Sequence, residues 1–412
     1  MGEGKGMTFF YSVLHLLVDG VCALAMFGSF LGREDGYFYI LVYNFCAFAL
    51  QMPFGVVLDS LQERERGWRD FACLMAGTGV LCTLAGAVTH PAVLGIGNAL
   101  FHVGGGVGVI REDRARGWRG RGLGVFVAPG ALGLFLGTQI AGTGAGLAWT
   151  GGIGILMALL CLAAWRCGRR GAARTEAPGT GQNRRAAEVP ETIGNEAADG
   201  RPTDAKMRET AANAAVDGGL TGAKLPGPVL ENLMGNESAE TADSRKRLPG
   251  RGPGQSGIIV AVCCLAVVAL RSYVGMAVAL PWKSGMLAGV LAVLAVVGGK
   301  MAGGFAGAAH GMRRTAIVSL GLAAVCYLGC AAMPLGLAAL FLFNMTMPVT
   351  LYWLVCSMPG RPGFAFGFLT FALFLGFLPV YFGLAVGNGN VLGCGGSILS
   401  LLLLAAGMGR RE

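Results

Sequence analysis

The sequence predicts an all-α polytopic membrane protein with about twelve transmembrane helices in two six-helix pseudo-symmetric bundles. Three observations predict this class: an apolar composition, long apolar runs, and a charged motif that occurs twice. Apolar residues make up 54% of the 412 residues, charged residues make up only 13%, and the mean hydropathy is +0.60. Water-soluble domains of this length rarely carry so few charges. We therefore expect a chain that folds in a lipid bilayer.

The apolar runs have the length of membrane-spanning helices. A helix needs about 20 apolar residues to cross a bilayer, whereas a membrane β-strand alternates apolar and polar residues over about 10. The first run is long, lacks a small-residue cleavage site and opens an internal repeat, so we expect a span and not a removed signal peptide. The predicted spans are approximately Thr8–Leu31, Tyr37–Asp59, Phe71–Val88, Pro91–Ile110, Leu123–Ile140, Leu147–Ala164, Ile258–Leu280, Gly285–Ala306, Thr315–Met333, Leu335–Val355, Phe364–Val386 and Val391–Met408.

The arginines of the loops predict how the chain crosses the membrane. They recur on alternate loops, beginning with the group around Arg64 and the group from Arg111 to Arg121, with Arg33 and Lys283 as the exceptions. Because Lys and Arg accumulate in cytoplasmic loops, we expect both termini to be cytoplasmic in a multi-pass protein of the plasma (cytoplasmic) membrane. The net charge of +9 then reflects topology, and we expect no nucleic-acid partner.

An abrupt change of composition divides the chain into three parts. Residues 168–256 are rich in Gly, Ala, Pro and charge and contain almost no large apolar side chain. Such a stretch cannot bury enough surface to fold by itself, so we predict a disordered cytoplasmic linker there. The N-terminal six-helix bundle is expected at residues 1–167 and the C-terminal one at residues 257–412.

A charged motif follows the second span of each half. The first copy lies within Gln51–Arg69 and the second within Gly304–Arg314. The two copies resemble G-x-L-A-D-R-x-G-R-R, the loop signature of the major facilitator superfamily of secondary transporters. The resemblance implies two six-helix bundles around a central cavity that opens alternately to the two sides of the membrane as the bundles rock.

The resemblance assigns both copies to a cytoplasmic gate. Asp59 lies at a helix end, where it can meet arginines and the N-terminus of a neighbouring helix, and such a contact can hold one of two conformations. Both copies depart from the signature, because Gln62 and Glu63 replace Gly and Arg in the first and Ala308 replaces the acid in the second. The assigned gate residues are Gly55, Asp59, Arg64, Gly304, Gly311, Arg313 and Arg314.

Ionisable side chains inside the predicted spans are candidates for a functional site, because each costs at least about 2.5–3.5 kcal/mol in the bilayer. His15 and Asp19 are four residues apart in the first span and share one helix face. His102 follows Asn98 in the fourth span, and Arg271 lies in the seventh. The structural alternatives are interhelical hydrogen bonds for the histidines, an ion pair with a cation for Asp19, and contact with outer headgroups for Arg271.

The fifth span carries a spaced set of glycines. Gly124, Gly133 and Gly137 fit the pattern G-x8-G-x3-G, and Gly142 closes it. The set resembles the fifth-helix motif of the antiporter branch of the superfamily, although Thr138 stands where that motif has a proline. Close helix packing is the alternative explanation, since the chain contains 70 glycines.

Three short segments resemble one branch of the superfamily more closely. They are the pair His15 and Asp19, the segment Ala99–His102, and the segment Leu270–Ser272. Together they look like the fosmidomycin-resistance-type efflux branch. That resemblance implies proton-linked efflux of a small compound.

The expected function is secondary active transport of a small molecule bound near the membrane midplane. We expect Arg271 to attract the substrate and Asp19 to carry the proton, because a low-dielectric cavity favours the neutral form of a carboxyl group. Amides within spans often join helices, so a substrate role for Asn44 is less favoured. The alternatives are a nutrient or organic-anion symporter, or a non-transporting sensor or scaffold. The candidates for substrate and proton coupling are Asp19, His15, His102, Arg271, Asn98 and Asn44.

The cysteines and the scattered histidines indicate no other chemistry. Nearly all of the 12 cysteines lie within spans and form no C-x-x-C pair near a histidine. We interpret them as small packing residues and expect no disulfide framework, metal site or cofactor. Paired carboxylates and a nucleophile elbow are missing from the sequence, so we expect no enzyme. The expected surroundings are the lipid bilayer, and the expected state is a monomer.

Overall fold

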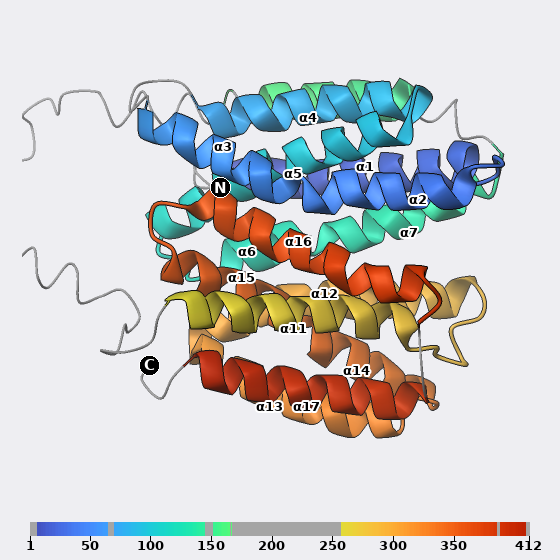
Figure 1. Ribbon diagram of the computed structural model, residues 1–412, viewed down its shortest axis with the longest axis vertical. Coiled ribbons are helices and arrows are strands. Elements are labelled where there is room, and N and C mark those ends of the chain that lie inside the picture. The colour runs from blue at the N-terminus through green and yellow to red at the C-terminus, as the bar shows by residue number, and fades with distance from the viewer. Residues whose placement is uncertain are drawn as a thin grey trace, which may run out of the picture. The chain divides into compact units, whose positions relative to one another are not determined.

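Every regular element among the described residues of the computed structural model is a helix (Figure 1). The structure describes residues 6–64, 70–144, 151–164, 166, 257–384 and 388–408. The linker predicted at 168–256 lies outside the described residues. All described helices belong to one unit of the chain, Met1–Thr175 together with Pro249–Glu412.

The N-terminal half contains helices that continue into one another within single spans. Its elements are α1 (Gly6–Ala25), the π-helix η1 (Met26–Phe30), α2 (Gly36–Asn44), the π-helix η2 (Phe45–Ala49), α3 (Gln51–Arg64), α4 (Phe71–Val88), α5 (Pro91–Ala115), α6 (Arg121–Val127) and α7 (Pro129–Ala141). The C-terminal half contains α11 (Gly257–Ala277), α12 (Met286–His310), α13 (Met312–Leu328), α14 (Met333–Asn344), α15 (Thr346–Ser357), α16 (Pro362–Tyr381) and α17 (Gly389–Gly407).

The predicted spans coincide with these helices. Among the described residues, ten helical segments are long and apolar enough to cross a membrane, judged by length and composition. The two remaining predicted spans correspond to the shorter helix Gly151–Ala164 and to α13, whose 17 residues begin with a pair of arginines. The helical membrane class that the composition predicts is therefore confirmed.

Large apolar side chains point away from the protein on many helices. Leu74, Leu81, Ile155, Leu287 and Val325 are each between 66% and 72% exposed. Exposed apolar area of this kind is unfavourable in water. It is the expected outer surface of helices that lie in lipid.

Several spans are interrupted within their apolar runs. The first and second spans contain the π-helices η1 and η2, and the fifth is broken at Ala128, before Pro129. The tenth is broken at Met345, three residues before Pro348. A proline has no N–H to donate and its ring crowds the preceding turn, which explains the last two interruptions. Pro379 lies inside α16 without breaking it.

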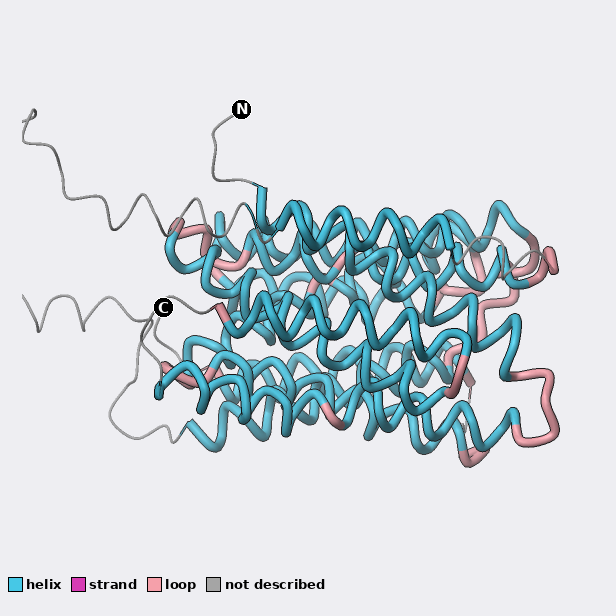
Figure 2. Tube along the Cα trace, turned by 90° about the horizontal axis from the view of Figure 1, so that it is seen from above, coloured by secondary structure: helices cyan, strands magenta, loops and turns pink. Residues whose placement is uncertain are grey.

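The two halves meet through α16 and α12. The helix α16 packs against α3 and η2, and α12 packs against α6 and α7. In Figure 1 the blue-to-green helices of the first half therefore adjoin the yellow-to-red helices of the second. The helices α1 and α11 begin, and α3 and α17 end, at the left-hand side of Figure 1, and Figure 2 shows the same bundle from above, with loops at both ends of the helices.

Candidate functional site

A cavity of about 620 Å³ lies between the halves, with walls from α1, α2, α5, α11, α12, α15 and α16. The lining is mainly apolar, and its volume is in the range of sites that hold drug-sized molecules, about 300–1,000 Å³. The π-helices η1 and η2 and the break at Met345 lie beside it, since Met26, Phe48 and Asn344 all line the wall. The interruptions of the helices thus coincide with the cavity.

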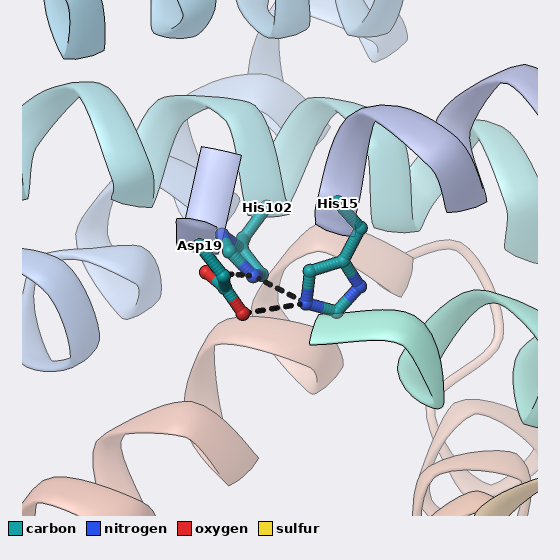
Figure 3. Close-up of side chains that lie close together, drawn as sticks. All are labelled: His15, Asp19 and His102. Carbon is teal, nitrogen blue, oxygen red and sulfur yellow. Dashed lines mark hydrogen bonds and ion pairs between the residues drawn. The ribbon is translucent and has the colours of Figure 1, made fainter. Parts of the chain in front are cut away.

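Three ionisable side chains converge on the N-terminal wall of the cavity (Figure 3). His15 and Asp19 come from α1, with 3.2 Å between Nε2 and Oδ2. His102 comes from α5, and its Nε2 lies 2.9 Å from Nε2 of His15 and 3.6 Å from Oδ1 of Asp19. We call this group the His–Asp–His cluster; all three residues are at least 92% buried.

The backbone fixes the outer nitrogen of each imidazole ring. Nδ1 of His15 lies 2.7 Å from the carbonyl oxygen of Phe126, one turn before the break at Pro129, and Nδ1 of His102 lies 2.8 Å from that of Asn98. A carbonyl oxygen only accepts hydrogen bonds, so both Nδ1 atoms carry a hydrogen and donate it. Two neutral rings would then direct lone pairs at each other across 2.9 Å. The arrangement with least repulsion places one proton between the two Nε2 atoms, beside the carboxylate of Asp19.

Asn98 links the cluster to α5. Its side-chain nitrogen donates to Oδ1 of Asp19 at 3.0 Å and approaches the sulfur of Cys22 at 3.5 Å. Its own Oδ1 is buried without a hydrogen-bond partner among the described residues. Asp19 therefore accepts one amide hydrogen bond and faces two imidazole rings, so its charge is well accommodated.

The cluster also offers a donor set that a divalent metal could use, two imidazole nitrogens and a carboxylate. Two observations favour a proton. Tetrahedral zinc bound at about 2.0–2.1 Å would hold the two nitrogens about 3.3 Å apart, farther than their 2.9 Å separation. The same cavity also receives two cationic side chains, Arg271 and Lys300, which repel a divalent ion more strongly than a singly charged proton.

The C-terminal wall carries those two cations. Arg271 on α11 is 8% exposed, and its Nη1 is buried with no hydrogen-bond partner among the described residues. Lys300 on α12 is partly exposed to the cavity, and its charge interacts with those of Arg271 and Asp19. Lys300 was not predicted as a site residue, and it lies between two pairs of glycines deep in an apolar run. A lone lysine at that depth was the available signal.

The structure brings most of the predicted coupling residues together. Asp19, His15, His102 and Asn98 make direct contacts, and Arg271 faces them from the opposite half across the cavity. The alternative ion pair between Asp19 and a cation is not formed among the described residues, where Asp19 pairs with the two histidines.

In the described part of the chain, Asn44 makes no hydrogen bond to the His–Asp–His cluster, in contrast to Asn98. It lines the cavity, but its side-chain nitrogen donates to the carbonyl of Ile40 on its own helix at 2.8 Å. Gln51 makes a similar contact, because its side-chain nitrogen donates to the carbonyl of Ala47, one helical turn earlier, at 2.6 Å. Its Oε1 is nevertheless buried without a partner among the described residues.

The first gate motif contacts the start of α16. Asp59 accepts hydrogen bonds from the backbone N–H of Gly363 at 2.9 Å and of Phe364 at 2.8 Å. One turn earlier, Gly55 lies so close to Gly363 that a Cβ there would overlap its backbone. This contact joins the two halves at the end of the helices where α1 begins. The side chain of Arg64 lies outside the described residues.

The second gate motif contacts α6. A Cβ at Gly304 would lie 2.7 Å from the carbonyl oxygen of Gly120 and 3.0 Å from Cα of Gly124. Gly124, which the sequence assigns to a separate motif, is thus a packing partner of the gate glycine. Gly311 connects α12 to α13 with φ of 92°, a left-handed conformation that favours glycine. Arg314 is exposed in the first turn of α13, and Arg313 beside it is half-buried.

The other glycines of the fifth span pack α7 against α1. A Cβ at Gly133 would overlap the carbonyl of Leu16, and one at Gly137 would overlap that of Gly20. Gly142 caps the end of α7, and a Cβ there would meet only its own helix end. Close helix packing therefore accounts for Gly133 and Gly137.

Comparison of the fold with solved structures gives matches over nearly the whole chain. One match is FucP, the fucose:proton symporter of E. coli, which is described as a Major Facilitator Superfamily transporter. Its outward conformation matches with a TM-score of 0.51 and 10% identity, over 97% of this chain and 99% of FucP. The human organic anion transporter MFSD10 matches with a TM-score of 0.56 and 12% identity over 98% and 99% of the two chains. The chain has the major facilitator superfamily fold.

A bacterial homologue of the iron transporter ferroportin, in its outward-facing state, shares the fold with a TM-score of 0.52 and 12% identity over 98% and 100% of the chains. By sequence, no family model and no curated protein matches. The superfamily fold consists of twelve membrane-spanning helices in two bundles, which confirms the predicted architecture. The matched proteins are described as transporters.

Proposed function

We propose that this protein is a proton-coupled secondary transporter that exports a small molecule by alternating access. The observation that carries the proposal is the His–Asp–His cluster, a buried group that faces a cavity between two halves and accommodates a proton between its two Nε2 atoms. The likeness of three short segments to the fosmidomycin-resistance-type branch supports the direction of transport. The plasma membrane and cytoplasmic termini follow from the arginine asymmetry.

In this mechanism the cluster is the proton carrier. Asp19 supplies the negative charge that retains the proton, and His15 and His102 hold it between Nε2 atoms whose rings are fixed by backbone carbonyls. Asn98 donates to the carboxylate from α5, and Lys300 interacts electrostatically with Asp19 from the opposite wall. Substrate in the cavity and the proton on the cluster alternate, so that each proton entering drives one substrate molecule out.

Asp59 is the proposed cytoplasmic gate residue. Its carboxylate holds the positive N-terminal end of α16, and rocking of the two halves has to separate these groups before the cavity can open on that side. Gly55 and Gly304 allow the close helix contacts on the two sides of the interface. Substrate binding itself does not involve this contact.

The proposal is tested in proteoliposomes with a panel of labelled organic anions. In Asp19→Asn, the side chain keeps its size and hydrogen bonding but loses the charge that retains the proton. We expect pH-driven transport to fall to the background level, whereas exchange of substrate for substrate continues. Asp35→Asn, at an exposed acid outside the cavity, is the matched control and retains pH-driven transport.

The direction of the pH effect separates export from uptake. Export predicts that an inward proton gradient drives the labelled compound out, and transport along the proton gradient would instead favour the symporter alternative. Undiminished pH-driven transport in Asp19→Asn would disprove the role of the cluster. Stimulation of transport by zinc, with no response to pH, would assign the cluster to a metal.

A further inference from the structure

The C-terminal wall of the cavity carries positive charge that no described residue of that wall balances. Arg271 and Lys300 project from α11 and α12 into the same cavity. Within the described part of the chain, neither forms an ion pair, and Nη1 of Arg271 makes no hydrogen bond. A buried cation without a partner is strongly unfavourable. The position therefore demands a negative group that arrives with a ligand.

The opposite wall does not supply that group. Asp19 is the one carboxylate among the described residues that line the cavity. Its oxygens already accept from Asn98 and face the rings of His15 and His102. The two cations of the C-terminal half thus exceed the acids available to them, and a ligand with two negative charges would balance both.

The remainder of the wall is mainly apolar and large. Phe27, Phe48, Met347, Phe366 and Leu373 line it, and its volume is about 620 Å³. A small hydrated anion would leave this surface uncovered. A ligand with an apolar body would remove it from water, which is favourable in proportion to the area covered.

We propose that the cavity binds an amphipathic organic dianion, with one acidic group on Arg271, the other on Lys300, and an apolar body against the aromatic and methionine side chains. The planar guanidinium of Arg271 suits a carboxylate, which it can bind through two parallel hydrogen bonds, whereas the ammonium of Lys300 acts as a point charge. This inference deepens the proposed transport function and rests on it for its physiological meaning. A neutral ligand would leave both cations unpaired, and a metal cation would increase the repulsion.

Binding to the purified protein in detergent tests the inference without requiring transport. The probes are suberate, an aliphatic dicarboxylate, octanoate, its monocarboxylate of equal carbon number, and suberamide, its neutral diamide. Affinities are measured by isothermal titration calorimetry. We expect suberate to bind at least about tenfold more tightly than octanoate, and suberamide to bind more weakly than either, because a hydrogen bond to a charged group is worth about ten- to a hundredfold in affinity.

Two variants assign the charges to their residues. Arg271→Gln and Lys300→Gln should each weaken suberate binding by about ten- to a hundredfold, and either variant should bind suberate and octanoate with nearly equal affinity. Arg33→Gln and Lys283→Gln remove the same charges from exposed positions and should leave the affinity for suberate unchanged. Equal affinities of the wild-type protein for suberate and octanoate, or no binding of suberate, would overturn the inference.

A readout on the ligand-free protein excludes a purely structural role of Arg271. Because Nη1 of Arg271 is buried without a partner, its replacement by glutamine should leave the unfolding temperature of the ligand-free protein unchanged or raise it, while the affinity for suberate falls. A fall in unfolding temperature with unchanged affinity would contradict the inference. Suberate binding without any pH-driven transport would disprove only the proposed coupling, since the affinity measurement does not depend on transport.

Discussion

Two helix starts at the same end of the molecule are capped by aspartates, but the caps differ in what they join. At the start of α16, Asp59 accepts from the N–H groups of Gly363 and Phe364 and comes from the opposite half of the chain. At the start of α6, Asp113 accepts from those of Gly120 at 2.7 Å and Gly122 at 2.8 Å, and it comes from α5 of the same half.

This difference accounts for the missing acid in the second motif. The two halves are related by the repeat, so the second motif faces α6 as the first faces α16. Ala308 replaces the acid in the second copy, and the N–H groups that an acid could have capped are already taken by Asp113. Of the two caps, therefore, only the one at Asp59 has to break when the halves separate.

The largest effect is expected from removing the close approach itself. In Gly55→Val the new side chain overlaps the backbone of Gly363, so α3 and α16 must move apart and Asp59 loses both hydrogen bonds. Overpacking of this kind costs about 1–3 kcal/mol, and we expect substrate transport to fall by at least about tenfold. Gly77→Val, at a glycine with open space around it, is the control; a normal rate in Gly55→Val would show that the contact is not used.

A smaller effect is expected from Asp59→Asn, which keeps one acceptor but loses the charge. Hydrogen bonds to charged groups are worth about 1.5–3 kcal/mol and neutral ones about 0.5–1.5, so the closed contact should weaken by roughly tenfold. Hydrogen exchange of the amides at Gly363 and Phe364 should accelerate by that factor. Turnover should change while the affinity for substrate stays constant, and a loss of affinity would contradict the gate assignment.

Asp113→Asn makes the same chemical change within one half and should have the smallest effect on transport. We expect the unfolding temperature to fall by a few degrees, in line with about 1–2 kcal/mol lost at the cap. The transport rate should remain within about twofold of the wild type, because the cap moves with its own bundle. If Asp113→Asn slows transport as strongly as Asp59→Asn, the distinction between the two caps is wrong.

The sequence predicted the spans well because a bilayer imposes one length and one polarity on every crossing helix. The spacing of His15 and Asp19 likewise placed both on one face, and the structure has both in the cluster. That His102 and Asn98 meet them depends on how α5 packs against α1. Such packing follows from many small contacts between distant segments, and sequence spacing does not encode it.

The features that the sequence did not predict are tertiary or lack a local signal. Lys300 is a lone lysine in an otherwise apolar run, and its position on the cavity wall depends on how α12 packs against the other helices. The π-helices η1 and η2 contain no proline, so their extra residue is accommodated by neighbouring helices. The pairing of Gly124 with Gly304 joins two motifs that appear unrelated along the chain.

The helix α16 contacts the first half at both of its ends. One end is the contact with Asp59; at the other, the rings of Tyr37 and Tyr381 stack with centroids 4.2 Å apart, and each hydroxyl donates to the other residue's carbonyl. With 20 residues, α16 extends about 30 Å, so the two contacts lie at opposite ends of one rigid helix. The contact with Asp59 is buried, whereas the tyrosine pair lies at an exposed surface. The contact with Asp59 should therefore persist longer than the tyrosine contact. The difference in strength between the two contacts would determine which end of the interface between the halves opens first when no ligand is bound.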